Sequence, residues 1–560
     1  MKMFLTILVF LQAFVCMGQL DPFNYTVTKN ITVKKAAVVS AHPLASDAGL
    51  QILRQGGNAI DAAIATQLAL AVVFPVAGNL GGGGFLVAHL QTGKKLAIDY
   101  REKAPGAASR DMYLDNSGNV IENLSINGHK AAGVPGTVAG LFKSHKYGKL
   151  PFQKLIEPAI KLARFGFVIT ASQANSFNRE REDFIRYNTK PVAFVKTGNW
   201  KEGDTLVQEH LARTLERIRD QGMKGFYEGE TAAFIVEEMS RGNGLISLND
   251  LATYDAVERE PAIFDYKGHE VITMPLPSSG GIVLPQMLKM TESRNLGKYG
   301  FHSPEAVQLM VESERRAYAD RAQHLGDADF VKVPVKKLTS REYLEARMID
   351  FVPGKAGSSN ITVPGSFPES EETTHLSVID QWGNAVAVTT TLNGGYGSKT
   401  IVGGAGFLLN NEMDDFSVKP GVPNMYGALG AEANAIAPGK RMLSSMTPSV
   451  VLKNGKPYII VGTPGGTTIT TSVYQSIVNI IDFRLSAYDA VNKPKFHHQW
   501  KPDVVYVEKD FPAETVKKLE AMGYKIVERG SIGATEMILI NRKKIEAVAD
   551  KRGNDSSAGY

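Results

Sequence analysis

The sequence predicts a protein of mixed α and β structure. Apolar residues make up 43% of the 560 residues, which is enough for a large buried core. Residues 373–393 alternate between polar and apolar side chains, as the two strands of a hairpin do. Residues 59–74 are apolar on nearly every side, which is typical of a buried helix. Periodicity alone predicts mixed structure and no finer fold class.

Residues 1–18 have the pattern of a secretory signal peptide. Lys2 precedes an apolar run over 3–15, and the small residue Gly18 follows. This run is short for a membrane span, and an uncleaved anchor is the alternative. We expect export to the periplasm, with the extracellular space as the alternative, and no stable membrane span.

Charge and cysteine content exclude several classes of function. The net charge is only +5, from 62 basic and 57 acidic residues, and no basic block occurs, so nucleic acid is not an expected partner. The one cysteine, Cys16, would leave with the signal peptide. The mature chain would then have no disulfide, thiol nucleophile or thiolate metal site.

Helix caps and glycines divide the chain into elements. Ser46 is expected to cap a helix that runs through Gln55, and Asn58 to cap the helix at 59–74. The glycine-rich run 78–84 lacks the Lys-Ser/Thr of a P-loop, so we expect it to pack backbone closely against a site. The later elements expected, in order, are strands at 85–90 and 95–100, a helix at 138–146, a mostly helical outer layer at 150–260, helices at 304–325 and 340–350, a strand at 458–462 and a helix at 468–483.

The hairpin at 373–393 gathers hydroxyl groups around its first residue. Gly383 suits the left-handed last position of a three-residue loop. In that register Thr373 lies opposite Thr391 and diagonal to Asn393, all on one face. The other face is apolar and holds Leu376, Val378, Val386, Val388 and Leu392.

A threonine hydroxyl is a weak nucleophile unless a base lies beside it. A cut just before Thr373 would free its own α-amine, whose ordinary pKa of about 7.7–8.0 suits a base. The preceding residues 353–372 are rich in Pro, Gly and Ser, which is typical of a flexible segment. An ordinary amphipathic hairpin explains the same pattern, and ordinary proteolysis could explain a cut there.

Five short motifs, in order, resemble the γ-glutamyltranspeptidases, and their bacterial branch in particular. The likeness runs from about Ala36 to Tyr560, and its motifs are Thr373–Val378, Thr391–Asn393, Leu409–Phe416, Leu443–Met446 and Gly462–Gly466. The resemblance implies an α+β, four-layer αββα N-terminal-nucleophile hydrolase fold, with two stacked sheets between helical layers. It also implies a precursor that cuts itself between Glu372 and Thr373. The products would be a large subunit, 19–372, and a small catalytic subunit, 373–560, which form a heterodimer around one shared core.

The resemblance also implies a reaction without a metal or cofactor. Such an enzyme cleaves γ-glutamyl compounds such as glutathione through a γ-glutamyl-enzyme, and transfers the acyl group to water, amino acids or dipeptides. The segment 417–435 is similar to a lid, which indicates small donors. The adjacent His497 and His498 lack a third nearby ligand, so we expect them to be structural.

The resemblance assigns the site residues. Thr373 would be the nucleophile, Thr391 would orient its amine, and the N–H groups of Gly465 and Gly466 would form the oxyanion hole. The expected substrate-binding residues are Arg101, Ser444 and Ser445 for the donor α-carboxylate, Asn393, Glu412 and Asp415 for its α-ammonium, and Tyr426 in the lid.

Two other functions remain open at this point. A glutaryl-type β-lactam acylase shares the fold, but glutaryl lacks the α-ammonium, so Glu412 and Asp415 would have no cationic partner. A non-catalytic secreted descendant would be expected to lose Thr373, Arg101 or the glycine pair, and all are present.

Overall fold

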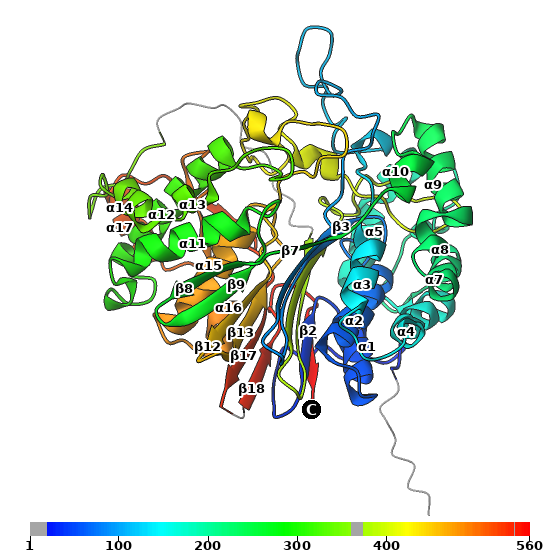
Figure 1. Cartoon of the computed structure of the whole chain (residues 1–560), viewed down its shortest axis with the longest axis horizontal. Helices are drawn as coiled ribbons and strands as arrows, with labels where there is room; N and C mark the ends of the chain where they lie inside the picture. The colour runs from blue at the N-terminus through cyan, green and yellow to red at the C-terminus, as the bar shows by residue number, and fades with distance from the viewer. Residues whose placement is uncertain (1–19, 360–372, 543) are drawn as a thin grey trace, which may run out of the picture.

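The computed structural model describes residues 20–359, 373–542 and 544–560 (Figure 1). The predicted signal peptide, 1–18, and Glu372 lie outside these residues. In the described part of the chain, no helix is both long and apolar enough to span a membrane.

Two seven-stranded antiparallel sheets form the centre of the molecule (Figure 1). The first sheet has the strand order β1 (Asn30–Val33), β18 (Lys544–Val548), β17 (Glu536–Asn541), β13 (Lys456–Gly462), β12 (Ser449–Lys453), β9 (His269–Thr273) and β8 (Ala262–Tyr266). The second has the order β19 (Ser556–Gly559), β2 (Ala37–Ser40), β10 (Thr373–Ile379), β11 (Ala385–Thr391), β3 (Gly83–His89), β4 (Lys95–Asp99) and β7 (Val257–Arg259).

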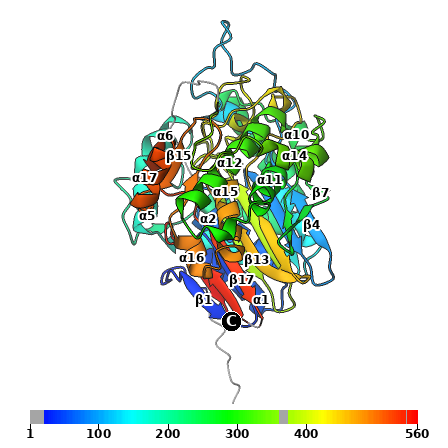
Figure 2. The same ribbon diagram turned by 90° about the vertical axis from the view of Figure 1, so that its left-hand side faces the viewer.

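Helices cover the outer face of each sheet. Those on the second sheet's side, at the right of Figure 1, are α1 (Pro43–Arg54), α2 (Ala59–Val73), α3 (Thr137–His145), α4 (Phe152–Phe165), α5 (Ala171–Arg179), α6 (Arg181–Arg186), α7 (Glu209–Gln221), α8 (Lys224–Tyr227), α9 (Gly229–Gly242) and α10 (Leu248–Ala252). Those on the first sheet's side, which faces the viewer in Figure 2, are α11 (Gly280–Glu292), α12 (Pro304–His324), α13 (Val335–Leu338), α14 (Arg341–Arg347), α15 (Thr468–Ile481), α16 (Ala487–Asn492) and α17 (Ala513–Ala521).

Short elements complete the fold. They are the strands β5 (Phe167–Val168), β6 (Thr205–Leu206), β14 (Phe496–His497), β15 (Val505–Glu508) and β16 (Ile526–Arg529), and the 3₁₀ turns η1 (His129–Ala131), η2 (Leu296–Lys298), η3 (Glu412–Asp415) and η4 (Glu432–Asn434).

Three apolar layers hold these elements together. Side chains of both sheets, such as Val87 and Ile460, meet between them. A second cluster joins the second sheet to α1–α4, and a third joins the first sheet to α11, α12 and α15. Burial of apolar area on this scale is the main stabilising term of a fold. The order helix, sheet, sheet, helix confirms the expected four-layer α+β architecture.

The hairpin has the predicted register. β10 and β11 pair Thr373 with Thr391, and Gly383 closes the loop with φ +91°. Leu376 and Val388 face the cluster under α2, which confirms the predicted apolar face. Because the side-chain period of a strand is two, this register places the hydroxyl face of Thr373 toward the other sheet.

One predicted cap is wrong and one is confirmed. α1 begins at Pro43 with His42 as its N-cap, and Ser46 lies inside the helix, where its hydroxyl donates to the Ser556 carbonyl at 2.7 Å. Proline is favoured in the first turn because its missing N–H has no partner there, and that signal outweighs the later serine. Asn58 caps α2 in a capping box with Asp61, as predicted.

Candidate active site

Thr373 is the first residue of β10, one of the inner strands of the second sheet. Its side chain is buried, and its hydroxyl lies 3.3 Å from the hydroxyl of Thr391 on β11. The Thr391 hydroxyl in turn accepts the N–H of Asn393 at 2.8 Å. Pairing with β11 therefore fixes the position of Thr373 within the sheet.

One small cavity brings most of the predicted residues together. It leaves about 20 Å³ of free space, roughly enough for one water molecule. The predicted residues that line it are Arg101, Thr373, Thr391, Asn393, Asp415, Tyr426, Ser444, Ser445 and Gly466. Glu412 and Gly465 lie just behind this lining, next to Arg101 and Gly466.

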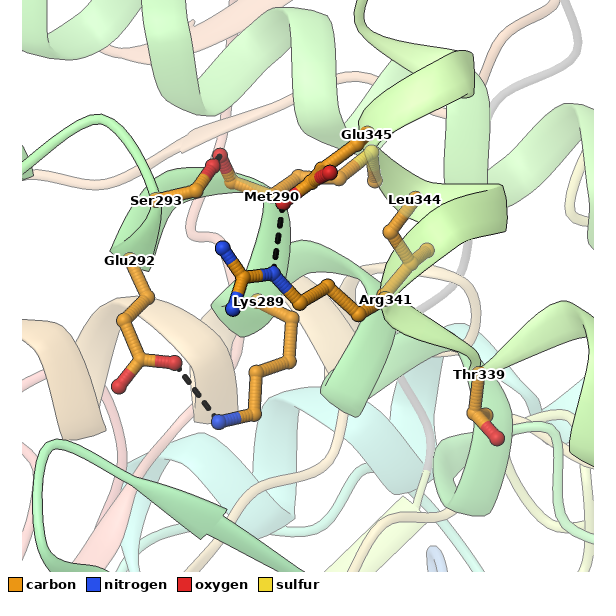
Figure 3. A pocket seen from close by; sticks show the side chains of 8 residues that line it. All are labelled: Lys289, Met290, Glu292, Ser293, Thr339, Arg341, Leu344 and Glu345. Atoms are coloured by element: carbon orange, nitrogen blue, oxygen red, sulfur yellow. Dashed lines mark hydrogen bonds and ion pairs between the residues drawn. The ribbon is translucent and has the colours of Figure 1, made fainter.

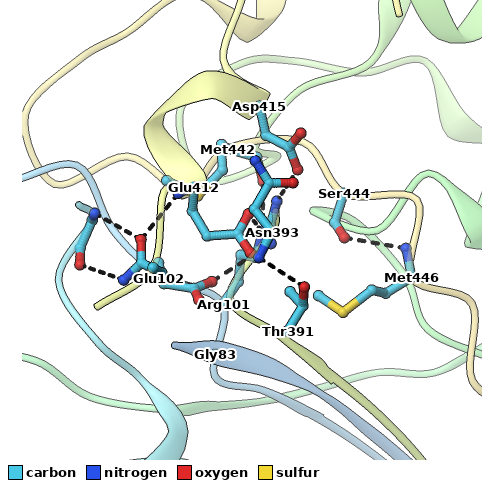
Figure 4. A network of polar contacts seen from close by, with 12 residues as sticks. Gly83, Arg101, Glu102, Thr391, Asn393, Glu412, Asp415, Met442, Ser444 and Met446 are labelled. Atoms are coloured by element: carbon cyan, nitrogen blue, oxygen red, sulfur yellow. Dashed lines mark hydrogen bonds and ion pairs between the residues drawn. The ribbon is translucent and has the colours of Figure 1, made fainter. Parts of the chain in front are cut away.

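Arg101 follows β4 and is almost completely buried. Its Nη1 lies 2.5 Å from the Glu412 carboxylate, its Nη2 donates to Asp415, and its Nε donates to the Met442 carbonyl at 3.3 Å (Figure 4). The groups predicted to bind opposite charges of the substrate thus pair with each other here. An α-amino acid carries the same two charges on one carbon, so it could exchange with this pair.

Burial shapes the ionisation of this cluster. It raises the pKa of Glu102 to about 8, and that of Glu412 well above its ordinary range. Burial also lowers the pKa of Arg101, but Glu412 and Asp415 outweigh that effect and hold the pKa above its usual value. Arg101 therefore remains a cation, whereas Glu102 and Glu412 can take up protons.

Tyr426 closes the cavity from the segment 417–435. Its hydroxyl donates to the Asn393 carbonyl at 2.7 Å, and its ring lies against Gly466. Asn424 of the same segment donates to Asp415 at 3.2 Å. A Cβ atom at Gly466 would lie 2.7 Å from the Tyr426 ring, so this close contact requires glycine.

The turn between β13 and α15 presents two backbone donors. Gly465 and Gly466 have φ values of +134° and +53°, which favour glycine. The Gly465 carbonyl is held by the N–H and hydroxyl of Thr468 at 2.9 and 2.8 Å. Within the described residues, neither glycine donates its N–H to a protein acceptor, so both remain available to an oxyanion.

Ser444 and Ser445 each accept a hydrogen bond from the protein. The Ser444 hydroxyl oxygen accepts the Met446 N–H at 3.2 Å (Figure 4), and that of Ser445 accepts from Arg321 Nη2 at 3.2 Å. A serine hydroxyl has a single proton to donate. Both side chains therefore keep an O–H donor that an anion could accept.

Sequence reasoning missed Arg321 and Asn424, which also line the cavity. Arg321 lies in the predicted helix 304–325, where no motif distinguished it from the other charges. Asn424 lies in the segment 417–435, where the resemblance indicates only Tyr426.

The adjacent histidines make ordinary structural contacts. His497 is buried between the Thr471 hydroxyl at 2.9 Å and the Gln499 side chain at 2.8 Å, and burial lowers its pKa to about 3. His498 approaches Asp503 at 3.3 Å. No group of three or more His, Cys, Asp or Glu side chains in the described chain could hold a metal ion.

A larger hollow of about 360 Å³ lies between α11 and α14 (Figure 3). Its charged side chains pair with one another, Lys289 with Glu292 and Arg341 with Glu345, each at 2.7 Å. This internal compensation leaves no free charge for a ligand, so the hollow is not a second candidate site.

Comparisons with known proteins identify the family of the chain. The profile of the family described as "Gamma-glutamyltranspeptidase" matches residues 45–560. The glutathione hydrolase proenzyme of Escherichia coli (strain K12) is 46% identical over 550 residues, which cover 96% of this chain and 95% of the relative.

Two solved structures share the fold. The cephalosporin acylase from Bacillus halodurans has a TM-score of 0.83 at 25% identity, and the match covers 97% of this chain and 99% of that chain. A chain of Helicobacter pylori gamma-glutamyltranspeptidase has a TM-score of 0.57 at 45% identity, and the match covers 58% of this chain and 94% of that chain. The family match, together with the 46% identity over nearly the full length, decides between the acylase and the transpeptidase: this chain belongs to the γ-glutamyltranspeptidase family.

Proposed function

We propose that this chain is a glutathione hydrolase proenzyme whose Thr373, once freed by a cut after Glu372, is the nucleophile toward γ-glutamyl amides. One observation carries the proposal: Thr373 is the first residue of an inner strand, and it lies beside a buried cluster of positively and negatively charged side chains. Arg101 and the pair Glu412 and Asp415 are the complement of an α-carboxylate and an α-ammonium on one carbon.

The same threonine would perform the self-cleavage. Its hydroxyl adds to the Glu372 carbonyl carbon, the peptide C–N bond breaks, and the acyl group moves to the threonine oxygen as an ester. Water then hydrolyses the ester, which frees the Glu372 carboxylate and the α-amine of Thr373. The products are residues 19–372 and 373–560, and the strands β2, β10 and β11 hold both in one sheet.

In the mature enzyme the freed α-amine acts as the base. It takes the proton of the Thr373 hydroxyl as the oxygen adds to the γ-glutamyl carbonyl, and Thr391 orients it. The N–H groups of Gly465 and Gly466 stabilise the oxyanion. The C–N bond then breaks, the leaving amine takes the proton, and water or an acceptor amine, of an amino acid or dipeptide, removes the acyl group.

The predicted signal peptide supports a periplasmic location.

A glutaryl-type acylase is the competing function. The charge of the site argues against it, because a glutaryl donor has no cation for Glu412 and Asp415. Leaving such carboxylates desolvated and without a substrate partner is costly.

Mass spectrometry of the purified chain, with turnover of a γ-glutamyl anilide, tests the proposal. The parent should give two polypeptides, the second beginning at Thr373, and should release the aniline. Thr373→Ala should remain one inactive chain. Thr374→Ala is the matched control, because its buried hydroxyl makes no hydrogen bond in the described part of the chain, and it should still be cut. A Thr373→Ala protein that is cut and active would refute the mechanism.

A further inference from the structure

We propose that Arg321, on α12, positions Ser444 and Ser445 for the donor α-carboxylate and supplies the second positive charge of the donor site. This inference rests on the γ-glutamyl activity proposed above. It assigns a specificity role to a residue that the family motifs did not indicate.

Arg321 contacts Ser445 directly and reaches Ser444 through Ser279. Its side chain is only 9% exposed, and its Nη2 donates to the Ser445 hydroxyl at 3.2 Å. Its Nε donates to the Ser279 hydroxyl at 3.3 Å, and that hydroxyl donates to the Ser444 carbonyl at 2.9 Å. One guanidinium therefore braces the two consecutive residues through two separate routes.

Arg321 forms no ion pair among the described residues, although it is buried; the charge of Asp415 acts on it only through space, and burial still lowers its pKa. Two neighbours on α12 differ in this respect: Arg315 and Arg316 lie 3.3 and 2.5 Å from the carboxylate of Glu312. A buried acid can avoid its charge by protonation, but an arginine stays charged in proteins. An uncompensated buried cation is costly, and an anionic ligand would relieve that cost.

The charges around Arg101 favour a second cation in the site. Arg101 is already engaged by Glu412 and Asp415, and Glu102 lies 3.5 Å from its Nη1. One cation among several acidic groups would favour a cationic ligand over a zwitterion. Arg321 adds a second guanidinium group to this acidic cluster, and the carboxylate of a zwitterionic α-amino acid group needs such a cation.

The hydrogen bond from Arg321 also fixes the direction of the Ser445 proton. Because the Ser445 oxygen accepts from a guanidinium, its own O–H must donate elsewhere. Ser445 lines the cavity, and a hydroxyl donates a strong hydrogen bond to a charged carboxylate there. Arg321 thus prepares the hydroxyl before the donor arrives, which lowers the ordering cost of binding.

Kinetics with two matched donors test the role. One is a γ-glutamyl anilide, and the other is the 4-aminobutanoyl anilide, which lacks only the α-carboxylate. Arg321→Met should raise KM for the γ-glutamyl donor about 10- to 100-fold, as expected for the loss of a charge-assisted contact, with a smaller change in kcat. The slow turnover of the 4-aminobutanoyl donor should change little, so the preference between the two donors should collapse.

Further variants separate positioning from folding. Arg321→Lys keeps the positive charge but lacks the planar guanidinium group with its several donors. It should recover part of the preference for the γ-glutamyl donor. In a double-mutant cycle with Ser445→Ala, the two losses should be less than multiplicative, because both act on one contact. Arg316→Met is the matched control on the same helix, and should leave the donor preference unchanged.

The outcomes distinguish the two proposals. An equal loss for both donors in Arg321→Met and Arg321→Lys, or multiplicative losses in the cycle, would overturn the role of Arg321. A parent protein that cuts itself but does not turn over the γ-glutamyl anilide would instead overturn the proposed function.

Discussion

Replacing Asp415 by asparagine should change the choice between γ-glutamyl and glutaryl donors. One carboxylate oxygen of Asp415 accepts from Arg101 and the other accepts from Asn424 at 3.2 Å. Asparagine keeps one acceptor oxygen and nearly the same shape. It removes the negative charge that would face a donor α-ammonium.

The magnitude follows from the burial of this carboxylate. The Asp415 side chain is 15% exposed, so water screens its charge only in part. A hydrogen bond to a charged group contributes about 1.5–3 kcal/mol. We therefore expect a loss of about 2 kcal/mol for the γ-glutamyl donor, or roughly 30-fold in kcat/KM. A glutaryl donor lacks the ammonium, and its carboxylate would compete with Asp415 for Arg101. Removing the Asp415 charge relieves that competition, so the kcat/KM of the glutaryl donor should rise several-fold.

The assay compares kcat/KM for matched γ-glutamyl and glutaryl anilides. Asp414→Asn is the control, because Asp414 lies in the same turn but holds Ser125 and the Met425 N–H, at 2.7 and 2.9 Å, instead of facing the cavity. If Asp414→Asn has any effect, it should lower kcat/KM for both donors by the same factor. If Asp415→Asn also lowers kcat/KM for both donors by the same factor, the Asp415 carboxylate only supports the turn and the selectivity argument fails.

Two further predictions concern the lid and pH. Tyr426→Phe removes the hydrogen bond to the Asn393 carbonyl, which should weaken donor binding by about 1 kcal/mol, or roughly fivefold in KM; an unchanged KM would contradict the role of Tyr426 in closing the site. Burial raises the pKa of Glu102 from 4.5 to about 8, so its contribution to stability is full below pH 4.5 and is lost as the pH rises through 8. Glu102→Gln should therefore flatten the fall in Tm between pH 5 and 9, and an identical pH slope in both proteins would show that Glu102 is not protonated in the fold.

The position of the proposed nucleophile could be predicted because it depends on local rules. Strand periodicity and the left-handed loop residue Gly383 fix the register of β10 and β11, and these place Thr373 opposite Thr391. No long-range information enters that step. The four-layer fold, by contrast, came only from the resemblance, since periodicity does not say which strands share a sheet.

The mutual pairing of Arg101 with Glu412 and Asp415 was not predictable from the sequence. The motifs assign each side chain to a different charge of the donor, and say nothing about the site without a ligand. The structure adds these two ion pairs, so a donor bound as proposed would exchange one set of ion pairs for another. The loss of the ion pairs within the protein then offsets much of the attraction between the site and the donor. Selectivity depends on how well each ligand replaces those ion pairs.

The same reasoning explains why Arg321 was overlooked. The residues 304–324 carry many charges, and a polar pattern predicts an exposed helix face, yet most charged side chains of α12 are buried. Burial is tolerated where charges are compensated, as when Arg347 meets Asp320 at 3.1 Å, or where an acid stays neutral, as when burial raises the pKa of Glu314 well above its ordinary range. A guanidinium has no neutral form to adopt. On a buried helix, the arginine without a carboxylate is therefore the charge that needs a ligand, and only the three-dimensional contacts reveal which arginine that is.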